Sequence, residues 1–407
     1  MRQGGLGRGQ WLQMVLLGSC SSLGPLALNV YLPGLPAVQD AFQGELSAVQ
    51  ATVSLPLLAF GLGLVLLGPF VDRYGRRSSL LVGIAAFIVG CVIAATAPSL
   101  GLLTLGRMIA SCATATTFIA SRAIVADRTP PEDLQRSVAQ ITMIMLVVQM
   151  VAPILGNFVL ASGGWQAIQW ALVALGLGVF GMAYARVPET LSAELRVKQG
   201  KASFGSLMSP TVALLRRASF LRSMLQVGLL YSAYPAFIAI APHLMVDTFH
   251  RPAWEYSYYY ACLPLGYFAG NAFVLRYGRK LGTHRLVLLG SMLGVLAAAT
   301  SLVLLARGVW HPLALFLPCG LLLNVGIGFA LPSVSAGAVN SAAPNTASGW
   351  GLAGFAQQAF AALAVQALAL FPATSPFPVV GICCSLVAAA LLIEWTTGRA
   401  LAGKLRP

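Results

Sequence analysis

The chain has 407 residues, of which 58% are hydrophobic and only 9% are charged. Soluble domains carry about 25% charged residues, so a soluble fold of this size could not cover so much apolar surface with polar side chains. The formal net charge of +14 would suit a nucleic-acid partner, but the placement of the basic residues excludes that partner, as shown below.

Long apolar runs alternate with short polar connections along the whole chain. A membrane-spanning helix needs about 20 mostly apolar residues, and continuous runs of this kind exclude the alternating strands of a membrane barrel. The first run follows Arg2 and Arg8 and is too long for a cleaved signal peptide. The sequence therefore predicts an all-α membrane protein with twelve transmembrane helices, near residues 10–33, 47–70, 78–97, 102–126, 137–162, 166–187, 221–246, 256–275, 285–306, 312–336, 347–371 and 377–397.

The longest polar stretch, residues 188–220, separates the first six predicted helices from the last six. This spacing predicts an N-terminal six-helix half over residues 1–190, a cytoplasmic linker over 191–220 and a C-terminal six-helix half over 221–407.

Basic residues indicate the orientation of the chain, because cytoplasmic loops are enriched in lysine and arginine. With both termini inside the cell, all but three of the 25 Lys and Arg residues fall on the cytoplasmic side, and the exceptions are Arg107, Arg251 and Arg307. We therefore expect a multi-pass protein of the cell inner (cytoplasmic) membrane with both termini in the cytoplasm. The positive charge is then a signal of topology, and we expect no nucleic acid as a partner.

The loop after the second predicted helix has the ordered spacing G-x-x-x-D-R-x-G-R-R over residues 68–77. Glycine permits close helix approach and tight turns, and a carboxylate is stabilised at the N-terminus of a helix. The stretch resembles the loop signature of the major facilitator superfamily, in which the acidic residue lies against the eleventh helix, here beginning near Asn345 and Thr346. The expected pair of Arg76 with Asp127 would complete a gating latch; the alternative is a solvated basic loop. The residues predicted for the latch are Gly68, Asp72, Arg73, Gly75, Arg76, Arg77 and Asp127.

Several other stretches resemble the Bcr/CflA drug-resistance branch of that superfamily. They are G-P-L-A-L-N-V-Y-L-P-G-L-P at 24–36, S-R-A-I-V-A-D at 121–127, A-P-I-L-G at 152–156 and P-E-T-L at 188–191. The resemblance implies the major facilitator fold and drug:proton antiport. It also places Pro153 and Gly156 in a motif of exporters, which favours export over uptake.

Asn29 departs from the pattern of that branch, which has a proton-coupling aspartate at this position. An asparagine cannot titrate, and the eleven acidic residues of the chain all fall in predicted loops or near predicted helix ends. We therefore expect no carboxylate at the middle of the membrane. His243 could titrate near neutral pH in place of the aspartate; the alternative is a hydrogen-bonded interfacial histidine.

Arg107 is a charged residue within the fourth predicted helix. Insertion scales assign such a residue a cost of about 2.5–3.5 kcal/mol, and charges of this kind usually face a cavity or a transport pathway. It can be held by backbone carbonyls, by Asn29 or by glutamine side chains. Alternatively, it can bind an anionic or dipolar group of the substrate, or repel a proton from a coupling site elsewhere. If the substrate supplies the opposite charge, cationic drugs should be poor substrates.

Aromatic and amide side chains could line a mostly apolar cavity that carries a few polar groups. Each of them could equally serve helix packing or a hydrogen bond between helices. The residues predicted to bind substrate are Asn29, Tyr31, Arg107, Tyr234, Phe237 and Gln357.

The function expected from these features is secondary export of small amphipathic organic molecules, such as antibiotics or metabolites, by alternating access with proton coupling. Alternatives are export of a self-made metabolite such as a siderophore, and an uncoupled facilitator or importer of a small nutrient. No Walker-type nucleotide loop, metal-ligand cluster or catalytic triad pattern is visible in the sequence, so we expect no enzyme activity, no cofactor and no metal. The expected partners are the lipid bilayer, the small-molecule substrate and protons, and the chain is expected to be a monomer.

Overall fold

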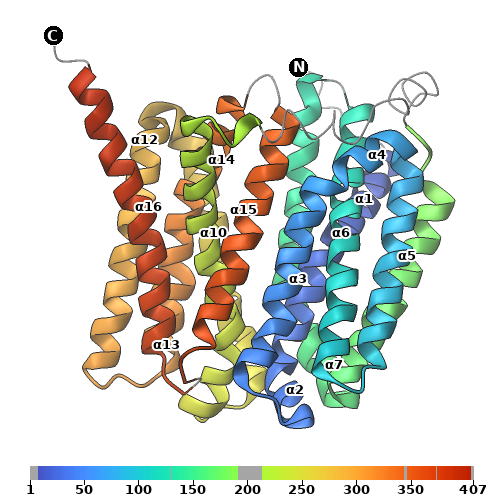
Figure 1. Cartoon of the computed structure of the whole chain (residues 1–407), viewed down its shortest axis with the longest axis horizontal. Coiled ribbons are helices and arrows are strands. Elements are labelled where there is room, and N and C mark those ends of the chain that lie inside the picture. The colour runs from blue at the N-terminus through green and yellow to red at the C-terminus, as the bar shows by residue number, and fades with distance from the viewer. Residues whose placement is uncertain (1–7, 130, 191–212, 343–345, 373, 405–407) are drawn as a thin grey trace. The chain divides into compact units, whose positions relative to one another are not determined.

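A computed structural model describes residues 8–129, 131–190, 213–342, 346–372 and 374–404 (Figure 1). Helices account for nearly all of these residues, and no strand occurs within the described ranges. This confirms the all-α membrane fold. The predicted linker at 191–220 lies mostly outside the described residues, because they resume only at residue 213.

The first compact unit groups Met1–Gly34 with Leu62–Leu207. A side-chain cap shows how local sequence sets one helix start here: Ser99 Oγ accepts a hydrogen bond from the Leu102 backbone N–H at 3.3 Å, which satisfies a donor that the first helical turn leaves open. The helices of this unit are α1 (Arg8–Tyr31), η1 (Leu32–Gly34), the last residues of α3 (Leu46–Leu66), α4 (Gly68–Tyr74), α5 (Arg76–Ala95), α6 (Leu100–Arg128) and α7 (Pro131–Arg186).

The second compact unit groups Leu35–Gly61 with Met208–Pro407. Within it, α12 packs against α14 and α16, and α10 packs against α14, α15 and α16 (Figure 1). Its helices are α2 (Leu35–Phe42), most of α3, α10 (Ala218–His243), η2 (Leu244–Thr248), η3 (Ala253–Glu255), α11 (Tyr256–Tyr260), α12 (Cys262–Ala306), α13 (Pro312–Leu315), η4 (Phe316–Leu322), α14 (Leu323–Ser341), α15 (Thr346–Leu368) and α16 (Phe377–Lys404).

Hydrogen bonds explain why residues 35–61 group with the second unit. Gln50 Nε2 donates to the Ala239 carbonyl of α10 at 3.2 Å. Ser54 Oγ donates to Gln366 Oε1 on α15 at 3.1 Å, and Gln366 Nε2 donates to the Ser47 carbonyl at 3.3 Å. Polar side chains buried without a partner are costly, so these bonds hold α3 to α10 and α15. The division of the chain into two six-helix halves at residues 190 and 221 stays a prediction.

Ten helical segments of the described residues are long and apolar enough to cross a membrane. Two long helices are interrupted by glycine in positions where the sequence predicts a connection. Gly164 has φ 72° in α7, and Gly282 has φ 75° in α12, a conformation that glycine adopts without steric cost. The exact number of twelve spans stays a prediction.

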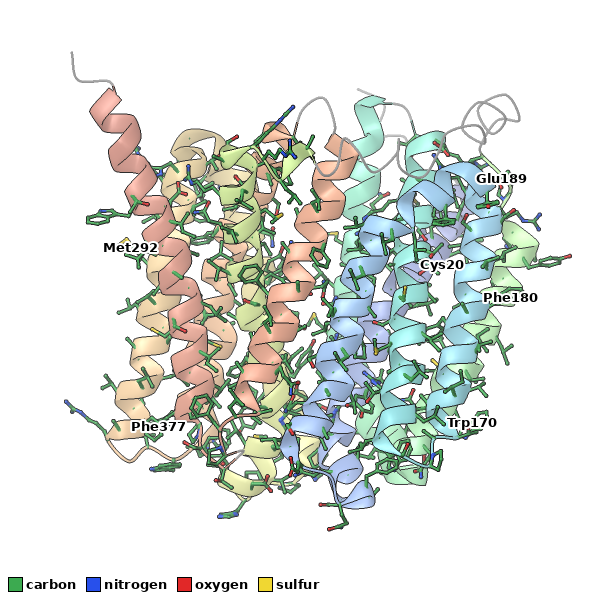
Figure 2. All side chains as sticks on the ribbon, in the orientation of Figure 1. Cys20, Trp170, Phe180, Glu189, Met292 and Phe377 are labelled. Atoms are coloured by element: carbon green, nitrogen blue, oxygen red, sulfur yellow. The ribbon has the colours of Figure 1, made fainter. Side chains whose placement is uncertain are left out.

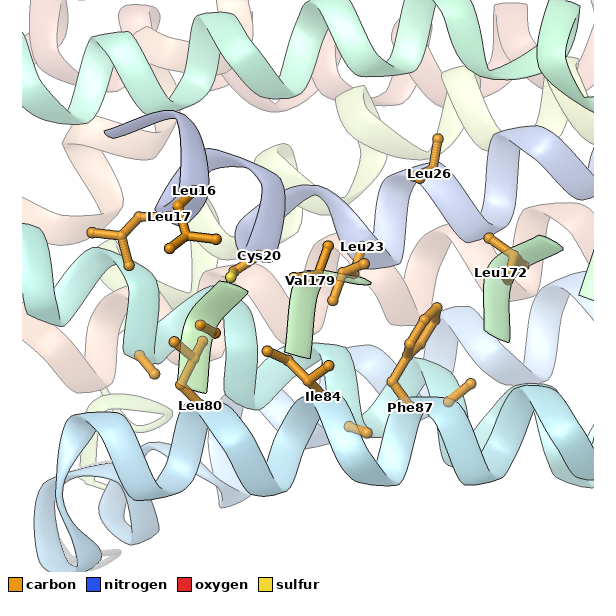
Figure 3. Close-up of a cluster of buried hydrophobic side chains, with 14 of the residues drawn as sticks. Leu16, Leu17, Cys20, Leu23, Leu26, Leu80, Ile84, Phe87, Leu172 and Val179 are labelled. Atoms are coloured by element: carbon orange, nitrogen blue, oxygen red, sulfur yellow. The ribbon is translucent and has the colours of Figure 1, made fainter. Parts of the chain in front are cut away.

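The first unit has a core of interlocking apolar side chains (Figure 3), and apolar side chains such as Trp170 and Met292 also cover exposed faces of the two units (Figure 2). Helices inside a membrane associate by close packing, while their outer apolar faces meet lipid. The core side chains labelled in Figure 3 are Leu16, Leu17, Cys20, Leu23 and Leu26 of α1, Leu80, Ile84 and Phe87 of α5, and Leu172 and Val179 of α7.

Candidate substrate-binding and gating residues

Arg107 lies on α6 and is almost completely buried, with 6% of its surface exposed. Its guanidinium carbon lies 3.5 Å from the centre of the Tyr31 ring, and Tyr31 on α1 is fully buried. A cation over an aromatic face is stabilised by about 2 kcal/mol or more when water is excluded. The charge of Arg107 is therefore held inside the first unit, beside a ring of the first helix.

Asn29 is buried on α1, two residues before Tyr31. Its Nδ2 donates a hydrogen bond to the Pro25 carbonyl one turn earlier, at 2.7 Å. The side-chain amide therefore supports the helix around Pro25 inside α1. An amide at this position binds and releases no proton.

Gly156 of α7 lies against α1 between Asn29 and Tyr31. A Cβ atom at this position would meet the Val30 backbone carbonyl closer than real contacts allow, so only glycine fits the crossing. Pro153 lies one turn earlier inside α7. The contact of α7 with Val30 thus fixes the segment of α1 that carries two of the predicted substrate-binding residues.

The second unit gathers Tyr234 and Phe237 of α10 into an aromatic cluster. The hydroxyls of Tyr234 and Tyr260 are hydrogen-bonded at 2.6 Å, and the Phe237 ring lies edge-on to Phe316 with 5.3 Å between centroids. Gln357 is half-buried on α15. The six predicted substrate-binding residues are therefore divided into Asn29, Tyr31 and Arg107 in the first unit, and Tyr234, Phe237 and Gln357 in the second.

The loop motif of residues 68–77 folds as a short helix, a glycine turn and the start of α5. Gly75 has φ 99° and ψ 153°, a backbone conformation that favours glycine. Arg76 Nε lies 3.4 Å from Asp127 Oδ2 at the end of α6, which is the ion pair that the sequence predicts. α15 begins at Thr346, which is the helix start that the sequence predicts near Asn345 and Thr346. The side chains of Asp72 and Arg73 lie outside the described residues.

Glu189 and Thr190 complete this motif, and sequence reasoning missed their role. Glu189 Oε1 accepts the Arg76 backbone N–H at 2.9 Å, and Thr190 Oγ1 donates to Asp127 Oδ2 at 2.8 Å. Arg77 Nη2 donates to the Tyr184 carbonyl at 2.9 Å. A carboxylate is stabilised by the N-terminus of a helix, so Glu189 caps α5 where Gly75 has no side chain to do so. In the sequence, residues 188–191 were notable only because P-E-T-L resembles the drug-resistance branch, and that resemblance does not predict a cap on α5.

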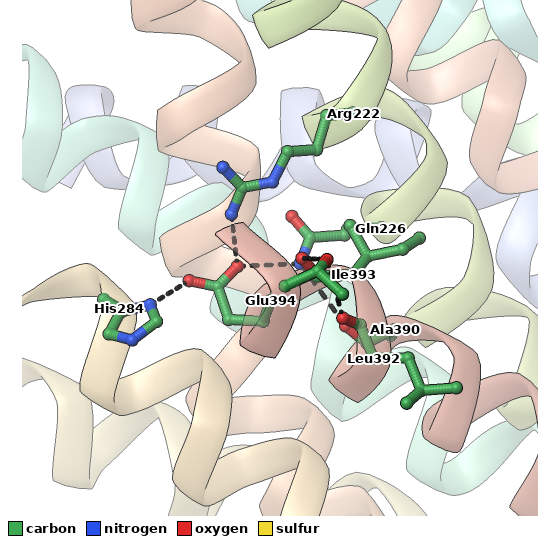
Figure 4. A network of polar contacts seen from close by, with 8 residues as sticks. Arg222, Gln226, His284, Ala390, Leu392, Ile393 and Glu394 are labelled. Atoms are coloured by element: carbon green, nitrogen blue, oxygen red, sulfur yellow. Dashed lines mark hydrogen bonds and ion pairs between the residues drawn. The ribbon is translucent and has the colours of Figure 1, made fainter. Parts of the chain in front are cut away.

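Glu394 forms a buried polar network in the second unit (Figure 4), which corrects the expectation that every carboxylate lies in a loop or near a helix end. α16 continues to Lys404, so Glu394 is interior to the helix, and only 5% of it is exposed. Its Oε2 accepts from Arg222 Nη2 at 2.7 Å and Gln226 Nε2 at 2.8 Å on α10, and its Oε1 contacts His284 Nδ1 on α12 at 2.5 Å. The sequence could have drawn attention to Glu394, because it is the one acidic residue after Glu255.

His243 occupies the last turn of α10 and is 1% exposed. Its Nε2 is hydrogen-bonded to Gln39 Oε1 of α2 at 3.0 Å. The ring therefore links α10 to α2 through a neutral amide. Within the described residues, no group of three or more His, Cys, Asp or Glu side chains is arranged to hold a metal ion.

Comparisons with known proteins agree with this architecture. The family model of the Major Facilitator Superfamily matches residues 17–365. The transporter YdgK of Bacillus subtilis is 27% identical over 78% of each chain, and the multidrug resistance protein MdtL of Escherichia fergusonii is 23% identical over 93% of this chain and 94% of the relative. The bicyclomycin resistance protein homolog of Haemophilus influenzae is 22% identical over 81% and 80%.

Solved structures show the same fold at low sequence identity. The xylose transporter XylE from E. coli has a TM-score of 0.74 at 14% identity and covers 97% of this chain and 98% of its own. Together with the apolar helices and the loop motif, these findings identify a multi-pass membrane transporter and not an enzyme. The chain belongs to the Major Facilitator Superfamily.

Proposed function

We propose that this transporter exports small amphipathic organic molecules from the cell by alternating access. Two relatives bear names of drug-resistance proteins and align with about four-fifths or more of the chain. The Gly156 crossing adds a second argument, because it lies in the stretch that resembles the exporter motif and fixes α7 to α1 at Val30.

The burial of Arg107 is the main observation that supports the proposed mode of substrate recognition. Its guanidinium is held on the Tyr31 ring within the membrane part of the first unit, and intramembrane charges of this kind usually serve a transport pathway. We infer that Arg107 binds an anionic or dipolar group of the substrate, so neutral dipolar and anionic molecules are better substrates than cations. Tyr234, Phe237 and Gln357 are proposed to contact the apolar part.

The proposed location is the cytoplasmic membrane, with both termini in the cytoplasm and the transporter acting as a monomer. The orientation rests on the positive-inside rule and on the placement of the basic residues in the sequence. In this orientation the proposed latch of Arg76, Asp127 and Glu189 lies on the cytoplasmic side. There it stabilises one conformation of the alternating-access cycle.

Proton coupling is part of the proposal, although Asn29 takes no part in it. Asn29 is bonded to its own helix at Pro25 and supports the second candidate function, an uncoupled facilitator or importer. The two functions differ in their dependence on the proton gradient, which makes them separable by measurement.

The proposal for Arg107 is tested with three probes in cells that lack their own drug exporters: fluorescein as an anion, chloramphenicol as a neutral dipole and ethidium as a cation. We expect lower accumulation of the first two in cells that contain the transporter. Arg107→Ala should abolish this difference at unchanged abundance in the membrane, and Arg107→Lys should retain part of it. Full export by Arg107→Ala, or export of ethidium alone, would contradict the assignment.

A further inference from the structure

The Glu394 network combines one carboxylate with two basic side chains from two other helices. An arginine keeps its positive charge, so Arg222 and Glu394 balance one another at 2.7 Å. The net charge of the network then depends on His284, because an imidazole is the group here that can bind an additional proton. One proton therefore changes the network from neutral to singly positive.

His284 is also the most accessible member of the network. Its side chain is 47% exposed, whereas that of Glu394 is 6% exposed. A carboxylate accepts hydrogen bonds, so Nδ1–H of His284 donates to Glu394 Oε1, and the second ring nitrogen, Nε2, is the atom that can take a proton from water. Protonation at Nε2 leaves the contact in place and puts a positive charge on the donor as well as the negative charge on the acceptor, so the hydrogen bond becomes an ion pair and is stronger.

The charged groups around this pair come from the helices that pack against α16. α10 contributes Arg222 to the network, and Arg217 near its start donates to the Ser341 carbonyl. α12 adds the exposed Arg276, Lys280 and Arg285. The side chains of Arg279 on α12 and Arg399 on α16 lie outside the described residues, and the sequences of α14 and α15 contain no charged residue. Glu394 is therefore a single acid among basic residues.

We propose that His284 and Glu394 form a proton-binding site that couples this transporter to the proton gradient. The inference rests on the proposed export function and names the group that takes the place of a titratable residue at position 29. The proton binds to Nε2 of His284 and leaves from the same atom, and no other bond is made or broken.

The site lies where three helices are joined. Glu394 is on α16, Arg222 and Gln226 are on α10, and His284 follows the Gly282 turn of α12. A protonated His284 holds α12 to α16 through an ion pair, and a neutral His284 holds it through a weaker hydrogen bond. Release of the proton therefore frees the second segment of α12 to move relative to α16.

The first test needs no substrate. Backbone hydrogen exchange is compared at about pH 5.5 and pH 8 in the full-length wild type, in His284→Gln, which keeps a donor without titrating, and in Glu394→Gln. The intrinsic exchange rate cancels when chains are compared at one pH. We expect about fivefold more protection in wild-type α12 and α16 than in His284→Gln at the lower pH, and equal protection at the higher pH. His250→Asn is the control, because Asn tolerates the φ of 50° at this position, and it should behave as wild type.

Equal protection of wild type and His284→Gln at both pH values would overturn the proton-binding site. The second test measures efflux of the probe that the wild type exports, with the proton gradient intact and then dissipated. His284→Gln should still move the probe but lose its dependence on the gradient, whereas His250→Asn should keep it. Gradient dependence that survives in His284→Gln would overturn the coupling role. A wild type that exports none of the three probes contradicts the proposed function instead, and hydrogen exchange still decides whether the site binds a proton.

Discussion

At the scale of single residues, the membrane part of the first unit is organised around the stacking of Arg107 on Tyr31. The ring face makes this contact, since the guanidinium carbon lies 3.5 Å from the ring centre. The sequence reveals Arg107 and Asn29 because each is unusual in an apolar run, but the partner of Arg107 is known only from the structure, because Tyr31 lies 76 residues away in the sequence.

The stacking predicts different effects for two substitutions of Tyr31. Tyr31→Phe keeps the ring and should export at close to the wild-type rate, while Tyr31→Ala removes a stabilisation of about 2 kcal/mol and should reduce export more than tenfold. The measurement is the initial rate of probe efflux at matched abundance in the membrane. Equal activity of the two variants would show that the ring does not position Arg107.

A second prediction at this scale distinguishes the role of His243 from that of His284 in the pH dependence of export. The His243 ring is buried and bonded to Gln39, so His243→Gln, which preserves a polar partner for Gln39, should keep the pH dependence of export. Efflux measured between about pH 6 and pH 8 decides the question. A variant that exports at a rate independent of pH would move the proton site from His284 to His243.

At the scale of helices, hydropathy predicts where each element lies, and the glycines at 163–164 and 282 interrupt α7 and α12 where the sequence predicts connections. The end of α16 is different. Apolar character fades near residue 397, so the sequence places Glu394 near a helix end, while the structure continues the helix to Lys404. The network of Glu394 joins helices whose partners lie 110 to 172 residues away, and no local pattern specifies such pairs.

The crossing of α7 over α1 predicts that Gly156 cannot be replaced even by alanine. The added methyl group would meet the Val30 carbonyl, and overpacking of this kind costs about 1–3 kcal/mol. Gly156→Ala should lower the melting temperature of the purified protein and its export. Gly181→Ala on the same helix is the control, because nothing lies within 4 Å of the added methyl group. Equal melting temperatures for the two variants would refute the proposed close contact.

The cap that Glu189 forms on α5 predicts a local effect. Loss of an N-terminal cap costs about 1 kcal/mol, and the exposure of Glu189 reduces this value through solvent screening. Glu189→Ala should raise hydrogen exchange in the first turn of α5 by a few-fold, whereas Glu45→Ala, also at an exposed position, should not. Unchanged exchange in that turn would mean that the carboxylate contributes nothing to the start of α5.

At the scale of the whole molecule, composition predicts the membrane class and the loop motif predicts the superfamily, which the match over residues 17–365 confirms. The grouping of residues 35–61 with the second unit could not be predicted, because it depends on Gln50, Ser54 and Gln366 finding partners across the chain. The substrate-binding residues and the inside location of the termini stay predictions, since they concern a ligand and a membrane.

The central claim is that this transporter exports its substrate at the expense of the proton gradient although position 29 cannot titrate. The most direct test is the accumulation of fluorescein and chloramphenicol in cells with and without the transporter, measured before and after a protonophore dissipates the gradient. The account predicts lower accumulation only while the gradient is present, with the difference abolished by the protonophore. Flux that is the same in both conditions, or uptake in place of export, would contradict it.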